Sequence, residues 1–386
     1  IMFSPRVTIV AFLMAAAISA NVHVRTADAF AFVPTATAST RQSISGGSVL
    51  LHSEKSSATT SSIEIPHGVT INDKIILRDP TPEERGKGGV EVASGSGINI
   101  KALEVLARIN RDLIVTSVDT PDRAMEAIST GRNLTWATDL TAATLAALHP
   151  TEEEIAASSA SDVVQAKKEW IQSWQTGGWG TSRADLGPEI AGDVLGCLLA
   201  MGSDNDKNVF AKFRMPCHPV LLKASMGLEV LTKCTEDEAR DALTARGFTY
   251  RSMRDALQTL VLESTERPKG TVRDKRCWDV ADTFSRVLSR ATTLQLEGNE
   301  DGDSVTIAHA IVPLHERLAH SLNENTKLVS IGNEILLVAT RDIAEGEPIT
   351  RDYTSAPRMV NDESPEGSAL HLLLQFGLPP NSWPQN

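Results

Sequence analysis

LLVATRDIAEGEPITRDYTS, residues 336–355, is the stretch on which the fold prediction depends. It opens with an apolar run, passes through a turn at Gly346, and returns to β-forming residues before Tyr353. Apolar, β-branched and aromatic residues bounded by Gly and Pro are typical of short strands. With the ten residues before it, the stretch predicts strand structure over 326–353. A polar loop and a last apolar helix or strand, ALHLLLQFGL (369–378), are expected to follow.

A second group of short strands is predicted at 68–117, where β-branched runs alternate with glycines. Between about 120 and 293 the apolar period becomes that of helices. The helices are predicted at 121–130, 139–148, 152–174, 188–201, 219–233, 236–246, 250–265 and 274–293. The order of strands, helices and strands predicts an α+β protein, in which one β-rich domain is interrupted by a helical lobe.

Helix boundaries in this lobe are predicted from capping residues. Thr151 with Glu154, and Thr235 with Glu238, have the spacing of capping boxes. The remaining signals are an N-cap followed by a first-turn proline, and glycines that end helices, namely Thr120, Pro121, Gly131 and Gly247. Trp170 and Trp174 are four apart on a predicted helix, and we expect them to pack in the core rather than to bind a ligand.

The composition excludes some classes of partner. The 386 residues are 41% apolar, which is ample for a buried core, and carry a formal net charge of −12. Such an acidic chain is not expected to bind nucleic acid or an anionic membrane. The cysteines lie far apart with no C-x-x-C pair, so neither a zinc knuckle nor a dithiol redox site is predicted, and buried reduced thiols are expected. They are Cys197, Cys217, Cys234 and Cys277.

The first 62 residues have the composition of targeting segments. Residues 1–29 contain a 13-residue apolar run, too short for a settled membrane span, and end at Ala-Asp-Ala, a pattern typical of signal-peptide cleavage. Residues 30–62 begin with Phe, are rich in Ser, Thr and Ala, and are poor in acids, as transit segments are. The pair resembles the bipartite presequence of algae with secondary plastids, which implies the plastid stroma. An ordinary secreted protein is the alternative.

PLHERLAHS, residues 313–321, superficially matches the helix of zinc proteases. In that motif the two histidines are four residues apart and lie close enough around the helix to share a metal. His315 and His320 are five apart, which turns the second ring by roughly 140°. We therefore predict no metal site here.

The C-terminal segments together resemble the SET domain, the β-rich fold of protein lysine methyltransferases. The resemblance lies in Arg341-Asp342-Ile343, in Gly346-Glu347 and Ile349, in Tyr353 seven residues after the glycine, and in the later LLLQFGL. In that register PLHERLAHS stands where the family has Pro-Leu-x-Asp-x-x-Asn-His-Ser, a cofactor-binding turn. GKGGVEVAS (86–94) looks like the family's opening Gly-x-Gly turn, and KALEVLARINRDLIVTS (101–117) like the strand pair that follows.

A long helical insertion is typical of the subgroup that includes the Rubisco large-subunit methyltransferase. The resemblance thus implies a SET core made of residues 63–117 and 294–386, with a helical lobe at 118–293 between them. The sequence departs from the family at three positions. Ala319 replaces an asparagine that holds the cofactor, Leu103 replaces a turn glycine, and Asn110 replaces a proline.

The resemblance also implies the site residues. Tyr353 would supply the catalytic hydroxyl, and Phe376 would line the lysine channel. His320 would lie under the adenine of S-adenosyl-L-methionine, with Ala319 beside it. The rest of the cofactor site would be the Gly turn and an arginine facing the cofactor carboxylate, namely Gly86, Gly88, Gly89 and either Arg286 or Arg290 downstream of Trp278.

The implied reaction moves a methyl group from the sulfonium of S-adenosylmethionine to a lysine of a stromal protein. The site must favour the neutral amine, since free lysine has a pKa near 10.4. It must also hold the reacting atoms in line at about 3 to 3.5 Å. The alternative is a catalytically inactive SET-fold protein that binds a partner through its helical lobe.

Overall fold

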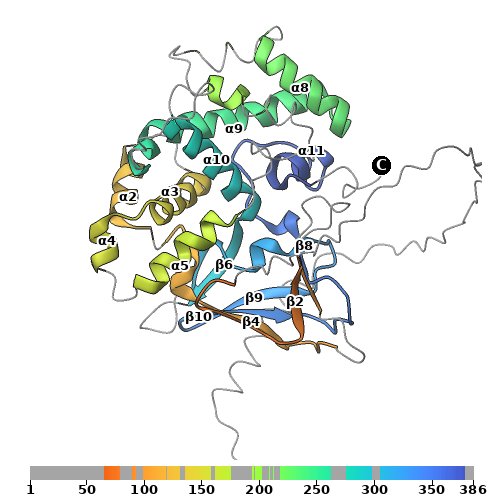
Figure 1. Ribbon diagram of the computed structural model, residues 1–386. Coiled ribbons are helices and arrows are strands. Elements are labelled where there is room, and N and C mark those ends of the chain that lie inside the picture. The colour runs from red at the N-terminus through yellow and green to blue at the C-terminus, as the bar shows by residue number, and fades with distance from the viewer. Residues whose placement is uncertain are drawn as a thin grey trace, which may run out of the picture. The chain divides into compact units, whose positions relative to one another are not determined.

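The computed structural model describes residues 65–78, 89–92, 99–118, 120–130, 135–157, 161–174, 194, 196–201, 208, 212, 218–261, 275–297 and 305–378. These residues contain helices together with mainly antiparallel sheets, so the protein belongs to the α+β class, as predicted. Figure 1 shows the helices gathered together and the strands gathered together. The predicted targeting segments, residues 1–62, lie outside the described part of the chain.

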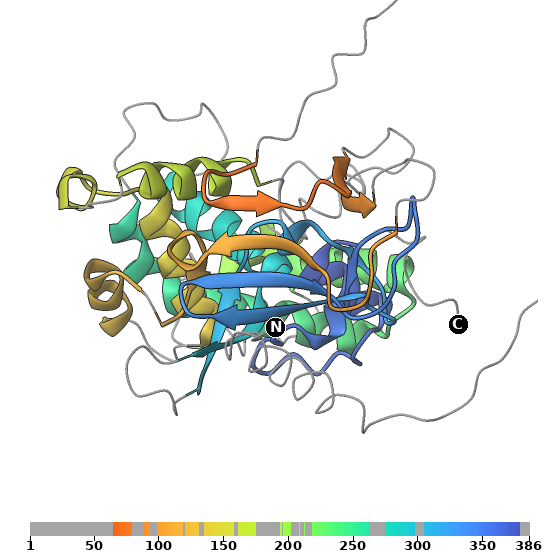
Figure 2. The same cartoon turned by 90° about the horizontal axis from the view of Figure 1, so that it is seen from below.

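The largest sheet joins the two groups of strands that the sequence predicts far apart in the chain. Its four antiparallel strands are, in order, β1 (Val69–Ile71), β4 (Val105–Asn110), β10 (Glu334–Ala339) and β9 (Thr326–Ile331). Ile335 pairs with Ile109 at its centre, and both side chains are buried. Figure 2 shows β4 beside β10, despite the whole helical region that separates them in sequence.

Three smaller sheets make up the rest of the β structure in the described residues. A three-stranded antiparallel sheet has the order β5 (Val115–Thr116), β7 (Val305–Ile311), β6 (Thr292–Glu297). An antiparallel pair is formed by β2 (Ile75–Arg78) and β3 (Gly89–Val92). A parallel pair is formed by β8 (Ala319–His320) and β11 (Thr350–Arg351).

The helices between β5 and β6 follow the predicted positions closely. They are α2 (Asp122–Ser129), α3 (Trp136–Leu148), α4 (Glu152–Ala157), α5 (Ser161–Gln172), α8 (Pro219–Thr232), α9 (Glu236–Leu257) and α10 (Lys275–Arg290). Both capping boxes are confirmed. Glu154 N–H donates to Thr151 Oγ1 over 3.1 Å, and Glu238 N–H donates to Thr235 Oγ1 over 3.2 Å.

Two predictions made from capping residues are wrong, and the helix predicted at 274–293 ends at Arg290 because β6 begins at Thr292. The first helix begins one residue late, with Pro121 rather than Thr120 at the N-cap, because the Thr120 hydroxyl donates to the Ser117 carbonyl instead. Gly247 does not end a helix but lies inside α9, which runs through both segments predicted as separate helices. A Cβ at position 247 would overlap the Met201 sulfur, so this glycine permits close helix packing rather than a turn.

Separate groups of buried side chains stabilise the helices and the sheets. One group lies among the helices and includes Tyr250, Phe284 and Leu243. A second lies among the strands. A third joins the two and contains Trp170 and Trp174, which meet edge to face at 5.1 Å between ring centres and are both buried. The prediction that this pair packs in the core is confirmed.

Candidate functional site

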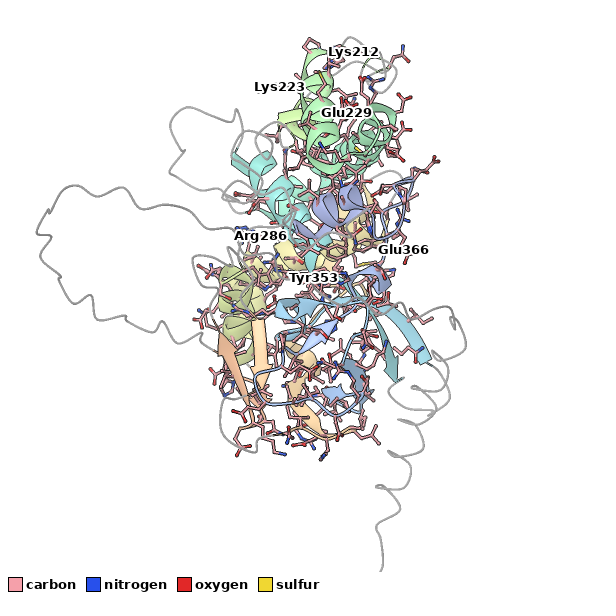
Figure 3. The ribbon with its side chains drawn as sticks, turned by 90° about the vertical axis from the view of Figure 1, so that its right-hand side faces the viewer. Lys212, Lys223, Glu229, Arg286, Tyr353 and Glu366 are labelled. Carbon is pink, nitrogen blue, oxygen red and sulfur yellow. The ribbon has the colours of Figure 1, made fainter. Side chains whose placement is uncertain are left out.

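Three aromatic side chains from distant parts of the C-terminal region stack on one another. The ring centre of Tyr353 lies 5.0 Å from that of His320 and 4.7 Å from that of Phe376, with interplanar angles of 32° and 36°. We call these three residues the Tyr353 cluster. Figure 3 places Tyr353 where the helices and the strands adjoin. Each residue is named by the sequence prediction for the site.

The parallel pairing of β8 with β11 brings His320 to Tyr353. Arg351 pairs with His320 in register, and Tyr353 follows β11 in a 3-10 turn, Tyr353–Ser355. The backbone N–H of Tyr353 donates to Nδ1 of His320 over 3.2 Å. Burial, opposed by the charge of Asp352, lowers the pKa of His320, so its neutral form with Nδ1 as acceptor prevails at neutral pH.

The Tyr353 hydroxyl has a defined partner. It donates to the backbone carbonyl of Leu318 over 2.8 Å, just before β8. The preceding turn is strained, since Leu314 is buried yet has φ of 71° and ψ of −47°. Such a γ-turn conformation is rare for a residue with a side chain, and strain of this kind collects at functional sites.

Phe376 is positioned by an unusual helix. After the short α11 (Ala369–His371), residues Leu372–Phe376 form a π-helix that ends at Gly377, where φ is 63°. π-helical turns are rare and are found frequently at functional sites. The extra residue per turn sets the direction of the Phe376 ring, which packs against Tyr353.

His371 and Gln375 fix this segment from inside. His371 Nδ1 accepts from the Gly367 N–H over 3.1 Å, and its Nε2 lies 3.1 Å from Oε1 of Gln375. Gln375 in turn donates to the Pro357 carbonyl over 3.0 Å. Only the neutral imidazole with its proton on Nε2 satisfies both contacts. Burial and the charge of Arg358 lower the pKa of His371 to about 4, so this form persists at neutral pH.

An ion pair ties the preceding loop to the helices. Arg246 on α9 lies 2.9 Å from Asp362, and both side chains are almost fully buried. Asp362 Oδ1 also accepts from the Ser364 hydroxyl over 2.7 Å. Burial acts to raise the pKa of Asp362, but the charge of Arg246 and the bonds from Ser364 outweigh it and hold that pKa below the ordinary value. The loop between Tyr353 and Phe376 is therefore anchored on the helical lobe.

Neither arginine predicted to face a cofactor carboxylate is poised for that role. Arg286 forms an ion pair with Asp282 at 2.8 Å and donates to the Trp174 carbonyl. Arg290 is buried, with its guanidinium over the Trp174 ring and Nε 3.9 Å from Glu316. Arg290 is the arginine that lies near the candidate site, because its partner Glu316 belongs to the turn that precedes β8.

Glu316 and Arg351 belong to the site region but were missed by sequence reasoning. Glu316 is buried and accepts from the Trp170 indole over 3.2 Å. Arg351 is buried and lies 4.6 Å from the centre of the Tyr353 ring. Charged residues in a strand or turn are usually solvated, and no local pattern marks these two as buried.

The strands at 292–311 were also missed, although Leu294 and Leu296 alternate with exposed residues in the period of a strand.

The predicted glycine turn is largely outside the described residues. Gly86 and Gly88 lie in the segment that is not described, and Gly89 is the first residue of β3, paired with Arg78. Ala319 is half-buried in β8 and pairs with Thr350, so the residue that replaces the family's asparagine is next to His320.

Neither a metal site nor a membrane-spanning helix occurs in the part of the chain that the structure describes. Within the described ranges, no three His, Cys, Asp or Glu side chains converge as metal ligands, and no helix has the length and apolarity to cross a membrane. Of the predicted buried thiols, Cys197 is buried and Cys234 half-buried, both unpaired, and burial raises the pKa of Cys197 to about 12. Comparison with protein-family models and with curated proteins finds no match for this chain.

Proposed function

We propose that this protein is a SET-type methyltransferase, which transfers a methyl group from S-adenosylmethionine to a lysine of a protein in the plastid stroma. The observation that carries the proposal is the Tyr353 cluster, in which Tyr353, His320 and Phe376 stack after the parallel pairing of β8 with β11. These are the three residues for which the sequence resemblance implies a catalytic hydroxyl, a cofactor contact and a channel wall.

The backbone at two departures from the family pattern supports the same register. Leu103 stands where the family has a turn glycine, and its φ is 67°, a conformation that favours glycine. Asn110 stands where the family has a proline, and its φ is −61°, the value that a proline ring imposes. The side chains have changed, but the backbone keeps the geometry that the family's residues prefer.

Each residue of the Tyr353 cluster would have its own role in methyl transfer. The neutral His320 packs against Tyr353 with an interplanar angle of 32° and would support the adenine end of the cofactor. The Tyr353 ring and Phe376 would enclose the acceptor side chain in an apolar channel, which disfavours a charged amine. The Tyr353 hydroxyl and the Leu318 carbonyl, already 2.8 Å apart, would contact the methyl group through weak C–H···O bonds. S-adenosylmethionine supplies an activated methyl group, and no metal is needed.

A second candidate function is a SET-fold protein without activity that binds a partner through its helical lobe. Ala319 favours it, since the loss of an asparagine side chain removes a polar contact worth about 1–3 kcal/mol. The positions of Arg286 and Arg290 favour it too, because both guanidinium groups are engaged by protein partners. Exposed Met226 and Val230 on α8 give that lobe apolar surface.

Calorimetric titration of the full chain with S-adenosylhomocysteine tests the proposal. We expect micromolar binding in the wild-type chain and weaker binding in His320→Ala. His309→Ala is the matched control, because His309 is a half-buried histidine that stacks on Trp136 instead. Tyr353→Phe should bind the cofactor product normally and lose methyl transfer.

The two candidate functions give different outcomes. Equal loss of binding in His320→Ala and His309→Ala would place the ligand elsewhere and contradict the assignment of the site. No binding at millimolar ligand would favour the partner-binding protein.

A further inference from the structure

Arg351 is a buried cation beside the Tyr353 cluster. Its side chain is 3% exposed, and its guanidinium carbon lies 4.6 Å from the centre of the Tyr353 ring. Its hydrogen bonds run to the backbone carbonyls of Ser289 and Ala291, over 3.3 Å and 3.5 Å. Among the described residues no carboxylate oxygen lies within ion-pair distance of Arg351, and its Nε has no hydrogen-bond partner.

Part of the role of Arg351 is to cap the C-terminal end of α10. Ser289 and Ala291 lie at the C-terminal end of α10, where carbonyl groups without helical partners attract a donor and the helix dipole favours positive charge. A neutral donor such as glutamine could satisfy the same carbonyls. A charge in the interior is costly, so capping alone does not explain an arginine at this position. Burial lowers the pKa of Arg351, but an arginine in a protein keeps its proton at neutral pH.

The charged and titratable groups that face Arg351 come from every element packed around it. They are Tyr353 after β11, His315 and Glu316 in the turn before β8, His320 on β8 and Glu324 before β9. The charged neighbours of these groups are Arg290, Arg317, Lys327 and Asp352.

Each of the carboxylates among them has nearer partners than Arg351. Glu316 binds the Trp170 indole and lies 3.5 Å from Arg317 Nε. Glu324 accepts from the Asp352 N–H over 3.0 Å and pairs with Lys327. The carboxylate of Asp352 is bound by the N–H and the hydroxyl of Thr354, both at 2.8 Å. The positive charge of Arg351 is therefore only partly compensated, and it acts on the neighbouring rings.

We propose that Arg351 provides a fixed positive charge that keeps the methyl-accepting nitrogen of the substrate in its neutral form. This inference rests on the proposed function and makes Arg351 a positioning residue that acts on the site through its field. A protonated lysine amine that approaches the Tyr353 hydroxyl would meet the guanidinium and release its proton to water. The neutral nitrogen then bonds to the methyl carbon as the carbon–sulfur bond breaks, which leaves a methylated ammonium group and S-adenosylhomocysteine.

The charge of Arg351 can shift the protonation of a nearby lysine amine by a useful amount. Two unit charges about 6 Å apart, at an effective dielectric constant near 20, shift an acid equilibrium roughly a hundredfold. That shift raises the neutral share of a lysine amine at pH 7 from roughly one molecule in 2,500 to roughly one in 25. The aromatic rings alone would provide only desolvation, since His320, Phe376 and the Arg351 guanidinium already pack around the Tyr353 ring.

The pKa of His320 measures the electrostatic effect of Arg351 without any substrate. Its ring centre lies 5.0 Å from that of Tyr353, and the charge of Arg351 contributes to its lowered pKa after burial. The experiment is an NMR titration of the imidazole Cε1–H signals of the full chain, in the wild type and in Arg351→Gln, Arg351→Met and Arg351→Lys. The signal of His320 is assigned by its loss in His320→Gln. Glutamine keeps a donor for the α10 carbonyls, so it serves if the methionine variant does not fold.

We expect the pKa of His320 to rise in the glutamine and methionine variants and to stay at its wild-type value in the lysine variant. An unchanged titration in Arg351→Gln would overturn the proposal, as would an equal rise in Arg351→Lys, because shape rather than charge would then be responsible. Calorimetry with S-adenosylhomocysteine on the same proteins separates the proposed function from the inference about Arg351. If no variant binds this ligand, the proposed function fails, whereas the titration of His320 still decides whether Arg351 sets the field at the cluster.

Discussion

The buried His371 predicts a specific loss of stability in acid. Its ring is 1% exposed, and both nitrogens are used as the neutral imidazole requires, with Nδ1 as acceptor and Nε2 as donor. Burial lowers its pKa to about 4, against 6.5 for a free imidazole. The folded state therefore binds fewer protons than the unfolded state between these values. The contribution of His371 to stability is complete above about pH 6.5 and is lost as the pH falls toward about 4.

The magnitude follows from the shift. At 1.36 kcal/mol for each pKa unit, the lowering to about 4 corresponds to about 3 kcal/mol of unfolding free energy. His371→Gln cannot titrate, so the difference in stability between the wild type and this variant should shrink by about that amount between about pH 7 and about pH 4. Titrating groups that do not interact with His371 change both proteins equally and cancel in the difference.

Urea unfolding at several pH values measures this difference. The matched control is His67→Gln, which makes the same substitution at an exposed residue before β1 and should leave the unfolding free energy almost unchanged. If the difference between the wild type and His371→Gln were constant from about pH 7 to about pH 4, His371 would titrate alike in the folded and unfolded chains. The reasoning from its burial would then be refuted.

Three further predictions concern packing, backbone strain and the buried ion pair. Gly247→Ala should destabilise the chain by about 1–3 kcal/mol in thermal unfolding, because the added Cβ overlaps the Met201 sulfur. The control is Gly196→Ala, in a helix where an added Cβ meets no atom within 4 Å, and it should be neutral or stabilising. Leu103→Gly should stabilise by about 1 kcal/mol by relieving a φ of 67°, and Leu103→Ala should not, since alanine keeps the strain. Asp362→Asn should cost about 3–5 kcal/mol because it leaves Arg246 buried and unpaired, and pairing it with Arg246→Met should recover much of that loss in urea unfolding.

Much of the fold could be predicted because local signals agree with tertiary structure. The capping boxes at Thr151 and Thr235 mark true helix starts, since a cap satisfies backbone groups without help from the rest of the protein. Gly247 misled because a glycine inside a helix and a glycine at its end look the same in sequence, and only the packing against Met201 distinguishes them.

The site was predictable to a different extent. Tyr353, His320 and Phe376 come from a motif register, and the structure brings the three together. The surroundings could not be predicted in the same way. Arg351 is buried because α10 ends beside it, and Glu316 because Trp170 reaches it from α5, and both contacts join residues far apart in the chain. Arg286 shows the converse, since Asp282 one helical turn away binds the guanidinium that the motif assigns to a cofactor.

Photolabelling with radioactive S-adenosylmethionine tests the central claim most directly, because it shows which residues the methyl donor touches. The full chain is irradiated with the labelled compound, and the labelled peptides are mapped after proteolysis. We predict label in peptides that contain residues 318–321 or 351–355, removed by an excess of unlabelled S-adenosylhomocysteine. Label that maps only to other peptides, or that persists in the presence of the competitor, would contradict the assignment of the Tyr353 cluster as the methyl-transfer site.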